Sequence, residues 1–222
     1  MNFKRVIKHR LNQFGLDVVR IPRPTKVVRR TGLAYYETQI GKYYLPINAT
    51  DDGIAHHMRS GQVFEPEVVE VARRFIKPGT AAIDVGSNFG QMAILFAKMG
   101  AHVYAIEAQE PVYQILCKNI EANKAQVTPV FVAAHNKSGE TFLFPKSDLV
   151  RWDAYGSYNL PLESEEGDPV QSKRIDELEI EAPVSFMKVD VQGFDLFAMQ
   201  GATKLIAKHK MPILFEFEQR FQ

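Results

Sequence analysis

The chain has 222 residues, of which 45% are apolar and 24% are charged, and its net charge is +1. This composition is typical of a soluble globular domain with a sizeable core, and no run approaches the roughly 18 apolar residues of a membrane-spanning helix. Cys117 is the only cysteine, so an intrachain disulfide is excluded and a reducing compartment is allowed. The N-terminus has no continuous apolar segment typical of a secretory signal, and we expect a cytoplasmic location.

The charges are unevenly distributed along the chain. Residues 1–30 contain nine Lys or Arg and one acidic residue, Asp17, so this segment carries +8 and the rest of the chain carries −7. The acidic main body argues against nucleic acid as the principal partner, because a nucleic-acid surface needs clustered positive charge. A small-molecule or carbohydrate substrate is the expected alternative.

The first 50 residues are predicted to form a small extension. Residues 3–14 place apolar side chains at helical spacing with basic residues on the other face, which favours a helix packed on the domain or on a partner chain. Peripheral contact of this basic helix with an anionic membrane is the alternative. Residues 20–30 are interpreted as an extended basic linker, and the tyrosine-rich residues 33–47 predict a two-stranded hairpin. The main domain is assigned to residues 51–222.

A glycine turn organises the main domain. A helix is predicted from Pro66 to Lys77, and residues 81–85 then form an apolar run that indicates a buried strand. Gly86 and Gly90 bracket a tight turn, after which helical spacing resumes. The turn therefore opens a helix at the carboxyl end of a strand, which is where open α/β sheets bind ligands.

The spacing within this turn disfavours a dinucleotide. The G-x-G-x-x-G pattern would require glycine at Asn88 and Gln91, and Asp84 at the mouth of the turn would repel a diphosphate. The next apolar run, 102–106, ends in Glu107, which is placed as the acid that binds ribose hydroxyls in such folds. The two acids and the glycines together indicate S-adenosylmethionine, which has a ribose but no phosphate.

The remaining pattern alternates between strands and helices, which predicts a mostly parallel sheet. An irregular aromatic stretch at 147–168, with the only tryptophan, Trp152, is interpreted as a binding loop for the acceptor. The other predicted elements are a helix over 111–123, a strand over 128–134, an antiparallel strand over 141–144, a fourth core strand over 184–190, a helix over 195–209 interrupted at Gly201, and a fifth strand over 213–217.

Three motifs together resemble the FkbM family of S-adenosylmethionine-dependent methyltransferases: Asp84-x-Gly86-x-Asn88-x-Gly90, then Glu107, then Lys188-Val189-Asp190-Val191-Gln192-Gly193. The similarity covers roughly residues 53–218. It implies the class I methyltransferase fold, an α/β, Rossmann-like, doubly wound and mostly parallel sheet, which is expected here to be short at its C-terminal end. It also implies O-methylation of a hydroxyl on a sugar, glycolipid or other secondary metabolite. The departures from the family pattern are Ser87 for alanine, Ala108-Gln109 where proline is usual, and Gln192 for glutamate.

The predicted site combines the motifs with the resemblance. Asp190, at the end of the fourth strand, is the first choice for a general base, and a structural acid that caps the following turn is the competing interpretation. Lys188 is expected to keep Asp190 ionised or to orient the acceptor, and His135 is a weaker candidate for a base or a ligand contact. The residues predicted to bind the cofactor are Glu65, Asp84, Gly86, Ser87, Asn88, Gly90, Glu107, Ala108, Ala134 and Asp190.

Two other functions remain open. A non-catalytic module that binds S-adenosylmethionine is favoured by Gln192, which removes a carboxylate, and a nicotinamide oxidoreductase is disfavoured by the failed dinucleotide pattern. No metal site is predicted, since the sequence has no paired cysteines and no H-E-x-x-H motif.

Overall fold

The protein is described by a computed structural model over residues 26–28, 32–49, 52–144, 167–191 and 193–216. The predicted N-terminal helix, nearly all of the aromatic loop with Trp152, and Gln192 lie outside the described residues. Within the described ranges, no helix is both long enough and apolar enough to cross a membrane.

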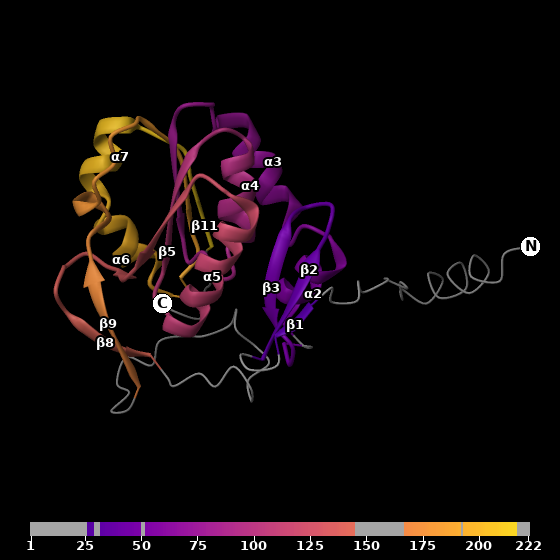
Figure 1. The fold of residues 1–222 in the computed structure, drawn as a ribbon. Coiled ribbons are helices and arrows are strands. Elements are labelled where there is room, and N and C mark those ends of the chain that lie inside the picture. The colour runs from indigo at the N-terminus through magenta and orange to yellow at the C-terminus, as the bar shows by residue number, and fades with distance from the viewer. Residues whose placement is uncertain (1–25, 29–31, 50–51, 145–166, 192, 217–222) are drawn as a thin grey trace, which may run out of the picture.

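A five-stranded parallel sheet forms the centre of the molecule (Figure 1). Its order from one edge to the other is β6 (Val127–Phe131), β5 (His102–Glu107), β4 (Ala81–Val85), β10 (Val184–Val189) and β11 (Ile213–Phe215). The chain begins the sheet in the middle at β4, builds outward to β6 and then crosses back to β10. The strand order therefore reverses between β4 and β10, and the prediction of a doubly wound, mostly parallel sheet is confirmed.

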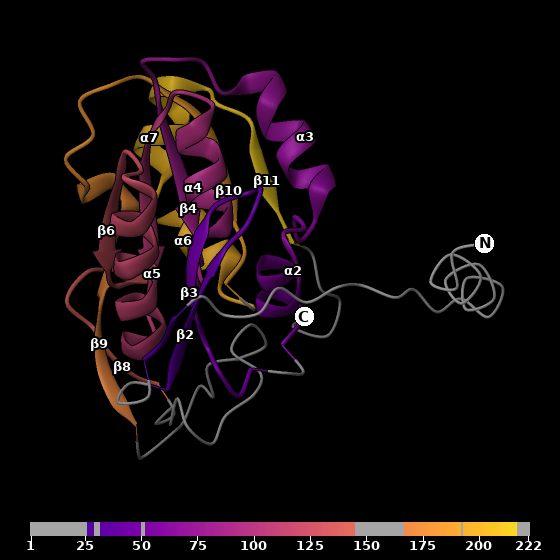
Figure 2. The ribbon, with the colours of Figure 1, turned by 45° about the vertical axis from the view of Figure 1, so that its right-hand side comes forward.

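Helices cover both faces of this sheet (Figures 1 and 2). The helices α3 (Pro66–Phe75), α4 (Gln91–Lys98) and α5 (Glu110–Asn123) pack on one face, and α6 (Asp195–Gln200) and α7 (Thr203–His209) pack on the other. Within β4, Ala82 faces the first layer while Ile83 and Val85 face the second, as the alternation of strand side chains requires. All five residues of β4 are buried, which explains why every residue of the strand except Asp84 is apolar.

The predicted hairpin is present as β2 (Leu33–Glu37) and β3 (Lys42–Pro46). The prediction of a linker over residues 20–30 was wrong for Lys26–Val28, which form β1 and pair with β2 in antiparallel fashion. No local sequence signal shows this, because the strand is defined by its partner. A short helix, α2 (Gly53–Ser60), follows the sheet. The core of this layer is continuous with that of the main domain, where Phe89 and Ile115 join it.

Two asparagines of α5 join the N-terminal sheet to the main domain. Asn119 Oδ1 accepts a hydrogen bond from Tyr44 N at 2.6 Å, and Asn123 Oδ1 accepts one from Lys42 N at 3.0 Å. Their amide nitrogens donate to the carbonyl oxygens of the same two residues of β3. The two side chains, one helical turn apart, thus occupy the free edge of β3 as a neighbouring strand would. Asn119 also donates to Phe89 O at 2.8 Å, which ties this layer to the glycine turn.

The predicted strand over 128–134 is divided in two. After β6, residues Ala133–Ala134 form β7, which leaves the parallel sheet and pairs with β9 (Asp168–Lys173). The predicted antiparallel strand is β8 (Thr141–Phe144), and it pairs with the other edge of β9. This small second sheet brings β8 to the carboxyl end of the main sheet. The interruption of the helix at Gly201 also agrees with prediction, since α6 ends there and α7 begins at Thr203.

Gly86 is predicted to tolerate no side chain. Its φ is +80°, and a Cβ atom at this position would collide with the carbonyl oxygen of Asp190. Gly79 is a matched control, because its φ is +79° but a Cβ atom there would have nothing within 4 Å. The substitution Gly79→Ala should cost about 1–2 kcal/mol of unfolding free energy. The substitution Gly86→Ala should cost about 3 kcal/mol or more, measured by denaturant unfolding, and equal costs would contradict the proposed collision.

Candidate functional site

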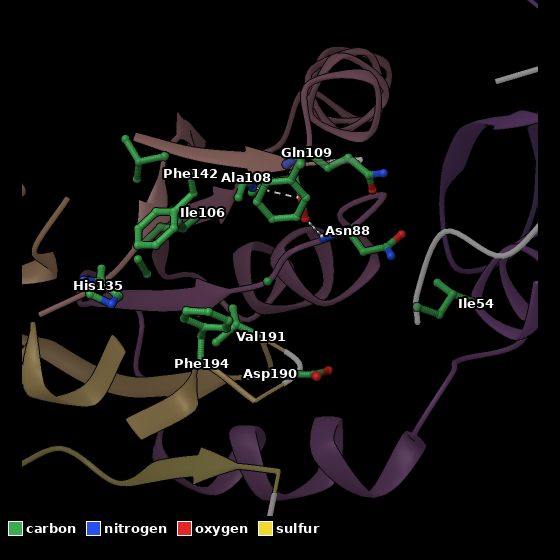
Figure 3. Close-up of a pocket in the computed structure, with 16 residues that line it drawn as sticks. Ile54, Asn88, Ile106, Ala108, Gln109, His135, Phe142, Asp190, Val191 and Phe194 are labelled. Atoms are coloured by element: carbon green, nitrogen blue, oxygen red, sulfur yellow. Dashed lines mark hydrogen bonds between the residues drawn. The ribbon is translucent and has the colours of Figure 1, made fainter. Parts of the chain in front are cut away.

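Two adjoining cavities open at the point where the strand order reverses, and Figure 3 shows the residues that line the larger one. The larger one runs from the ends of β4 and β5 to the small sheet, and the smaller one lies between β4, β10 and the start of α3. Four residues line both cavities, namely Ile54, Gly86, Asn88 and Asp190. The two cavities are therefore parts of one cleft at the carboxyl ends of the central strands, where α/β sheets of this kind bind ligands.

The glycine turn is held in shape by hydrogen bonds to the neighbouring strand. The backbone N–H groups of Gly86 and Ser87 both donate to Ile106 O at 2.9 Å, and Ser87 Oγ donates to Asp84 O at 2.7 Å. Gly90 has a φ of +87° and lies at the N-cap of α4, but it lines neither cavity. Its role is therefore to shape the turn, while Gly86 and Asn88 form the wall of the cleft.

Glu107 is fixed by three backbone donors. Its Oε2 accepts a hydrogen bond from Asn88 N at 2.9 Å, and its Oε1 accepts from Ala108 N at 3.0 Å and Gln109 N at 2.9 Å. Burial raises the pKa of the carboxyl, and these hydrogen bonds act in the opposite direction. A carboxylate has about four lone-pair positions, so acceptor capacity remains for a ligand in the larger cavity. This is the arrangement needed to bind a hydroxyl group.

The smaller cavity contains one ammonium group and three carboxyl groups. Lys188 is 4% exposed, and its Nζ donates to Asp190 Oδ2 at 2.9 Å. Burial by itself lowers the pKa of Lys188, but Asp84, Asp190 and Glu65 outweigh this effect and raise the pKa. The register of β4 and β10 places Lys188 directly beside Asp84. The smaller cavity is consequently suited to a cationic group and unsuited to a phosphate.

Asp84 adds a specific reason to expect a cationic ligand. The residue is completely buried, and neither carboxylate oxygen has a hydrogen-bond partner in the part of the chain that the structure describes. Burial raises the pKa of this carboxyl, and the nearby Lys188 lowers it, as do the Ser87 hydroxyl and the Ala93 N–H, which lie close to the carboxylate without forming a well-aligned hydrogen bond. Buried acceptors without partners are rare because each one is costly, and a ligand ammonium group would satisfy them.

Glu65 is presented to the same cavity by an uncommon backbone conformation. It is the residue before α3 and has left-handed dihedrals, φ 50° and ψ 65°, yet its side chain makes no capping hydrogen bond. Burial is the main cause of its raised pKa, which Lys188 partly offsets. Strained non-glycine residues of this kind cluster at functional sites.

Gln91 holds the segment that carries Glu65. Its Oε1 accepts a hydrogen bond from Phe64 N at 2.8 Å, and its Nε2 donates to Gln62 O at 3.0 Å. Gln91 is 3% exposed and is the first residue of α4. One amide thus connects the glycine turn to the segment before α3.

The far end of the larger cavity is aromatic. Phe142 and Phe144 of β8 and Phe194 line it together with His135. The ring of His135 stacks on Phe197 at a centroid distance of 4.9 Å, and its Nδ1 lies 3.4 Å from Glu140 Oε2. The pKa of His135 is lowered, because the effect of burial exceeds the opposing effect of the Glu140 carboxylate. Figure 3 places His135 at the opposite end of the cavity from Asp190, so the structure does not bring these two candidate catalytic residues together.

Of the residues predicted from the sequence, all except Gly90 line the cleft. Those in the larger cavity are Glu107, Ala108, Ala134 and His135; those in the smaller one are Glu65, Asp84, Ser87 and Lys188; and Gly86, Asn88 and Asp190 line both. The cleft residues that the sequence did not single out are Ile54, Phe64, Gln91, Met92, Ile106, Gln109, Val132, Phe142, Phe144, Val191 and Phe194. Only those next to a recognised motif, such as Ile106 and Val191, carried a signal that could have revealed them.

The geometry fits one cofactor class in each of its parts. The carboxyl groups of the smaller cavity suit an α-amino group and a sulfonium, Glu107 suits ribose hydroxyls, and the aromatic end suits a flat base. Among the described residues, no cluster of side chains could hold a metal ion. Each part of the cleft is thus chemically complementary to one part of S-adenosylmethionine.

The family follows from the sequence comparison. A family model described as the methyltransferase FkbM domain matches residues 84–222, and the chain therefore belongs to the FkbM methyltransferase family. No curated protein sequence matches the chain significantly.

Solved structures similar to the chain include two methyltransferases and TYW2, a protein crystallised with AdoMet. The Pyrococcus abyssi tRNA (uracil-54, C5)-methyltransferase in complex with S-adenosyl-L-homocysteine is 14% identical over 83% of this chain and 34% of that chain, with a TM-score of 0.45. The Geobacter metallireducens precorrin-6y C5,15-methyltransferase is 12% identical over 69% of this chain and 62% of that chain, with a TM-score of 0.41. M. jannaschii TYW2 in complex with AdoMet is 23% identical over 45% of this chain and 43% of that chain, with a TM-score of 0.32. The chain thus spans less than two thirds of each.

We predict that Gln91→Ala weakens binding of S-adenosylhomocysteine about tenfold, since a loss near 1.4 kcal/mol of preorganisation corresponds to this factor. The physical reason is that Glu65 would no longer be held beside Lys188. Calorimetric titration would measure the affinity, with Gln171→Ala as the control because this exposed amide makes its hydrogen bond to Thr141 on the small sheet. In a Glu65→Ala background, Gln91→Ala should have little further effect. A full additional tenfold loss there would show that Gln91 does not act through Glu65.

Proposed function

We propose that the protein O-methylates a hydroxyl group of a small acceptor, such as a sugar, a glycolipid or another secondary metabolite, with Asp190 as the general base. The observation that carries the proposal is the position of Asp190. It lines both cavities, and its carboxylate lies 2.9 Å from the ammonium group of Lys188. A base is therefore available where the two parts of the cleft meet.

Separate parts of the cleft would hold the cofactor. Glu107 would bind the ribose, and Ala108 and Ala134, with the aromatic side chains, would contact the adenine. Asp84 and Glu65 would face the methionine end, where the unpartnered oxygens of Asp84 support binding of an ammonium group. The backbone of the glycine turn, at Gly86 and Asn88, would lie against the middle of the molecule.

The chain's own residues supply positioning and proton transfer. Bound S-adenosylmethionine provides an electrophilic methyl group, so the protein needs no covalent nucleophile. Asp190 would accept the proton of the acceptor hydroxyl as its oxygen attacks. Lys188 would orient the carboxylate of Asp190 through their hydrogen bond. Asp195 supports this arrangement, because its carboxylate accepts hydrogen bonds from Val191 N and Gly193 N and so closes the loop after Asp190.

A small acceptor is proposed in preference to a nucleic acid. Two of the similar structures are a tRNA methyltransferase and a precorrin methyltransferase, but likenesses with TM-scores of 0.45 and 0.41 carry no argument about the acceptor. The net charge of −7 over residues 31–222 is the stronger observation, since nucleic-acid binding needs a basic surface. Membrane contact by the basic N-terminal helix stays a prediction, because that segment lies outside the described residues.

We predict that calorimetric titration will show saturable binding of S-adenosylhomocysteine and none of NAD. The substitutions Asp84→Ala and Glu107→Ala should each weaken S-adenosylhomocysteine binding by tenfold or more, because each removes a charged acceptor. Glu121→Ala, at an exposed acid on α5, is the control and should bind normally. Unchanged affinity in both site variants would refute the cofactor placement, and binding of NAD instead would support the oxidoreductase alternative.

We predict that Asp190→Asn lowers turnover of a hydroxylated acceptor by about 10²- to 10⁴-fold, the usual contribution of a general base. Asparagine retains the shape of aspartate, so the affinity for S-adenosylhomocysteine should change far less than kcat. Methyl transfer from radiolabelled cofactor to a panel of sugars and glycolipids would measure turnover. Full turnover in the variant would mean that Asp190 is not the base. Cofactor binding by the unmodified protein without turnover of any acceptor would favour the non-catalytic module.

A further inference from the structure

The side chain of Gln109 has an unsatisfied donor within the cleft. Gln109 lines the larger cavity and is 4% exposed, and its amide nitrogen Nε2 is buried without a hydrogen-bond partner among the described residues. Its backbone N–H, by contrast, donates to Glu107 Oε1 at 2.9 Å. The residue is thus fixed beside the carboxylate of Glu107 while its terminal amide remains available to donate.

A buried amide without a partner is costly. Leaving such a group unpaired costs its desolvation with nothing gained in return, and the great majority of buried polar groups are paired in native proteins. Figure 3 shows the amide of Gln109 extending toward the side of Asn88, at the end of the cavity away from His135. The donor therefore lies away from the aromatic end and near the part of the cavity that Glu107 and Asn88 form.

The neighbouring acceptor indicates what kind of group the amide would meet. The carboxylate of Glu107 can only accept hydrogen bonds, so a hydroxyl bound to it would use its hydrogen there and leave its own oxygen lone pairs unused. The Nε2 donor of Gln109 complements those lone pairs. A ribose hydroxyl can satisfy both groups at once, because it is a donor and an acceptor.

We propose that Gln109 Nε2 donates a hydrogen bond to a ribose hydroxyl of the bound cofactor and makes Gln109 a specificity residue for that sugar. The inference rests on the proposed function, since it assumes that S-adenosylmethionine occupies the cleft.

The experiment compares two variants and three ligands by calorimetric titration. Gln109→Met retains the length of the side chain without a polar group, and Gln109→Glu retains its shape without a donor at neutral pH. The ligands are S-adenosylhomocysteine and its 2′-deoxy and 3′-deoxy analogues. Gln171→Met, at an exposed glutamine on β9, is the matched control, and circular dichroism with thermal melting would verify folding of each variant.

The expected result is that both Gln109 variants bind S-adenosylhomocysteine about tenfold more weakly than the unmodified protein, while the control variant binds equally well. For one of the two deoxy analogues, the difference between the unmodified protein and Gln109→Met should disappear, because the hydroxyl that the amide binds is missing. If Gln109→Met does not fold, the same comparison with Gln109→Glu decides the question.

Two contrary results are distinguishable. If the unmodified protein binds S-adenosylhomocysteine and both variants bind it as tightly, the role of Gln109 is refuted and the proposed function is unaffected. The same conclusion follows if the tenfold difference persists for both deoxy analogues, since the amide would then act on another group or on a bound water. If the unmodified protein binds no S-adenosylhomocysteine, the proposed function and this inference are both overturned.

Discussion

The close approach of the glycine turn to the end of β10 is the constraint on which the rest of the structure depends. Because Gly86 has no side chain, the backbone of Asp190 can pass against it, and β4 and β10 remain paired up to their carboxyl ends. That pairing places Lys188 beside Asp84 and brings the backbone of Asp190 against the turn. The two cavities meet at this contact, so the shape of the cleft follows from one backbone packing requirement.

The charged groups that line the smaller cavity, beside the glycine turn, are the second organising feature. A buried ammonium group is tolerated only when it is paired. Lys188 is in direct contact with Asp190, and the carboxyl groups of Asp84 and Glu65 lie near the same ammonium group. Three carboxyl groups exceed the charge of one lysine, which leaves the smaller cavity with a preference for cations. This preference distinguishes the cleft from the phosphate sites of dinucleotide-binding folds, although the strand order and the position of the turn are alike.

The N-terminal layer completes the cleft and does not merely cover the domain. Ile54, Phe64 and Glu65 come from this side of the chain and line the cavities beside residues more than 100 positions later, such as Lys188 and Asp190. Side-chain amides make the connections: Asn119 joins β3 to the glycine turn, and Gln91 joins the segment before α3 to the start of α4. Amides suit this purpose because each can donate and accept at once.

The sequence by itself determined the parallel sheet, the glycine turn and the acids at the carboxyl ends of β4, β5 and β10, because each is a local pattern of apolar spacing combined with a fixed motif. It did not reveal that Lys26–Val28 form a strand, that the stretch after β6 turns away to pair with β9, or that Phe142, Phe194 and Gln109 line the cleft. These features depend on which distant segments meet. Strand pairing, burial and unsatisfied donors are properties of contacts between segments, so only the tertiary structure decided them.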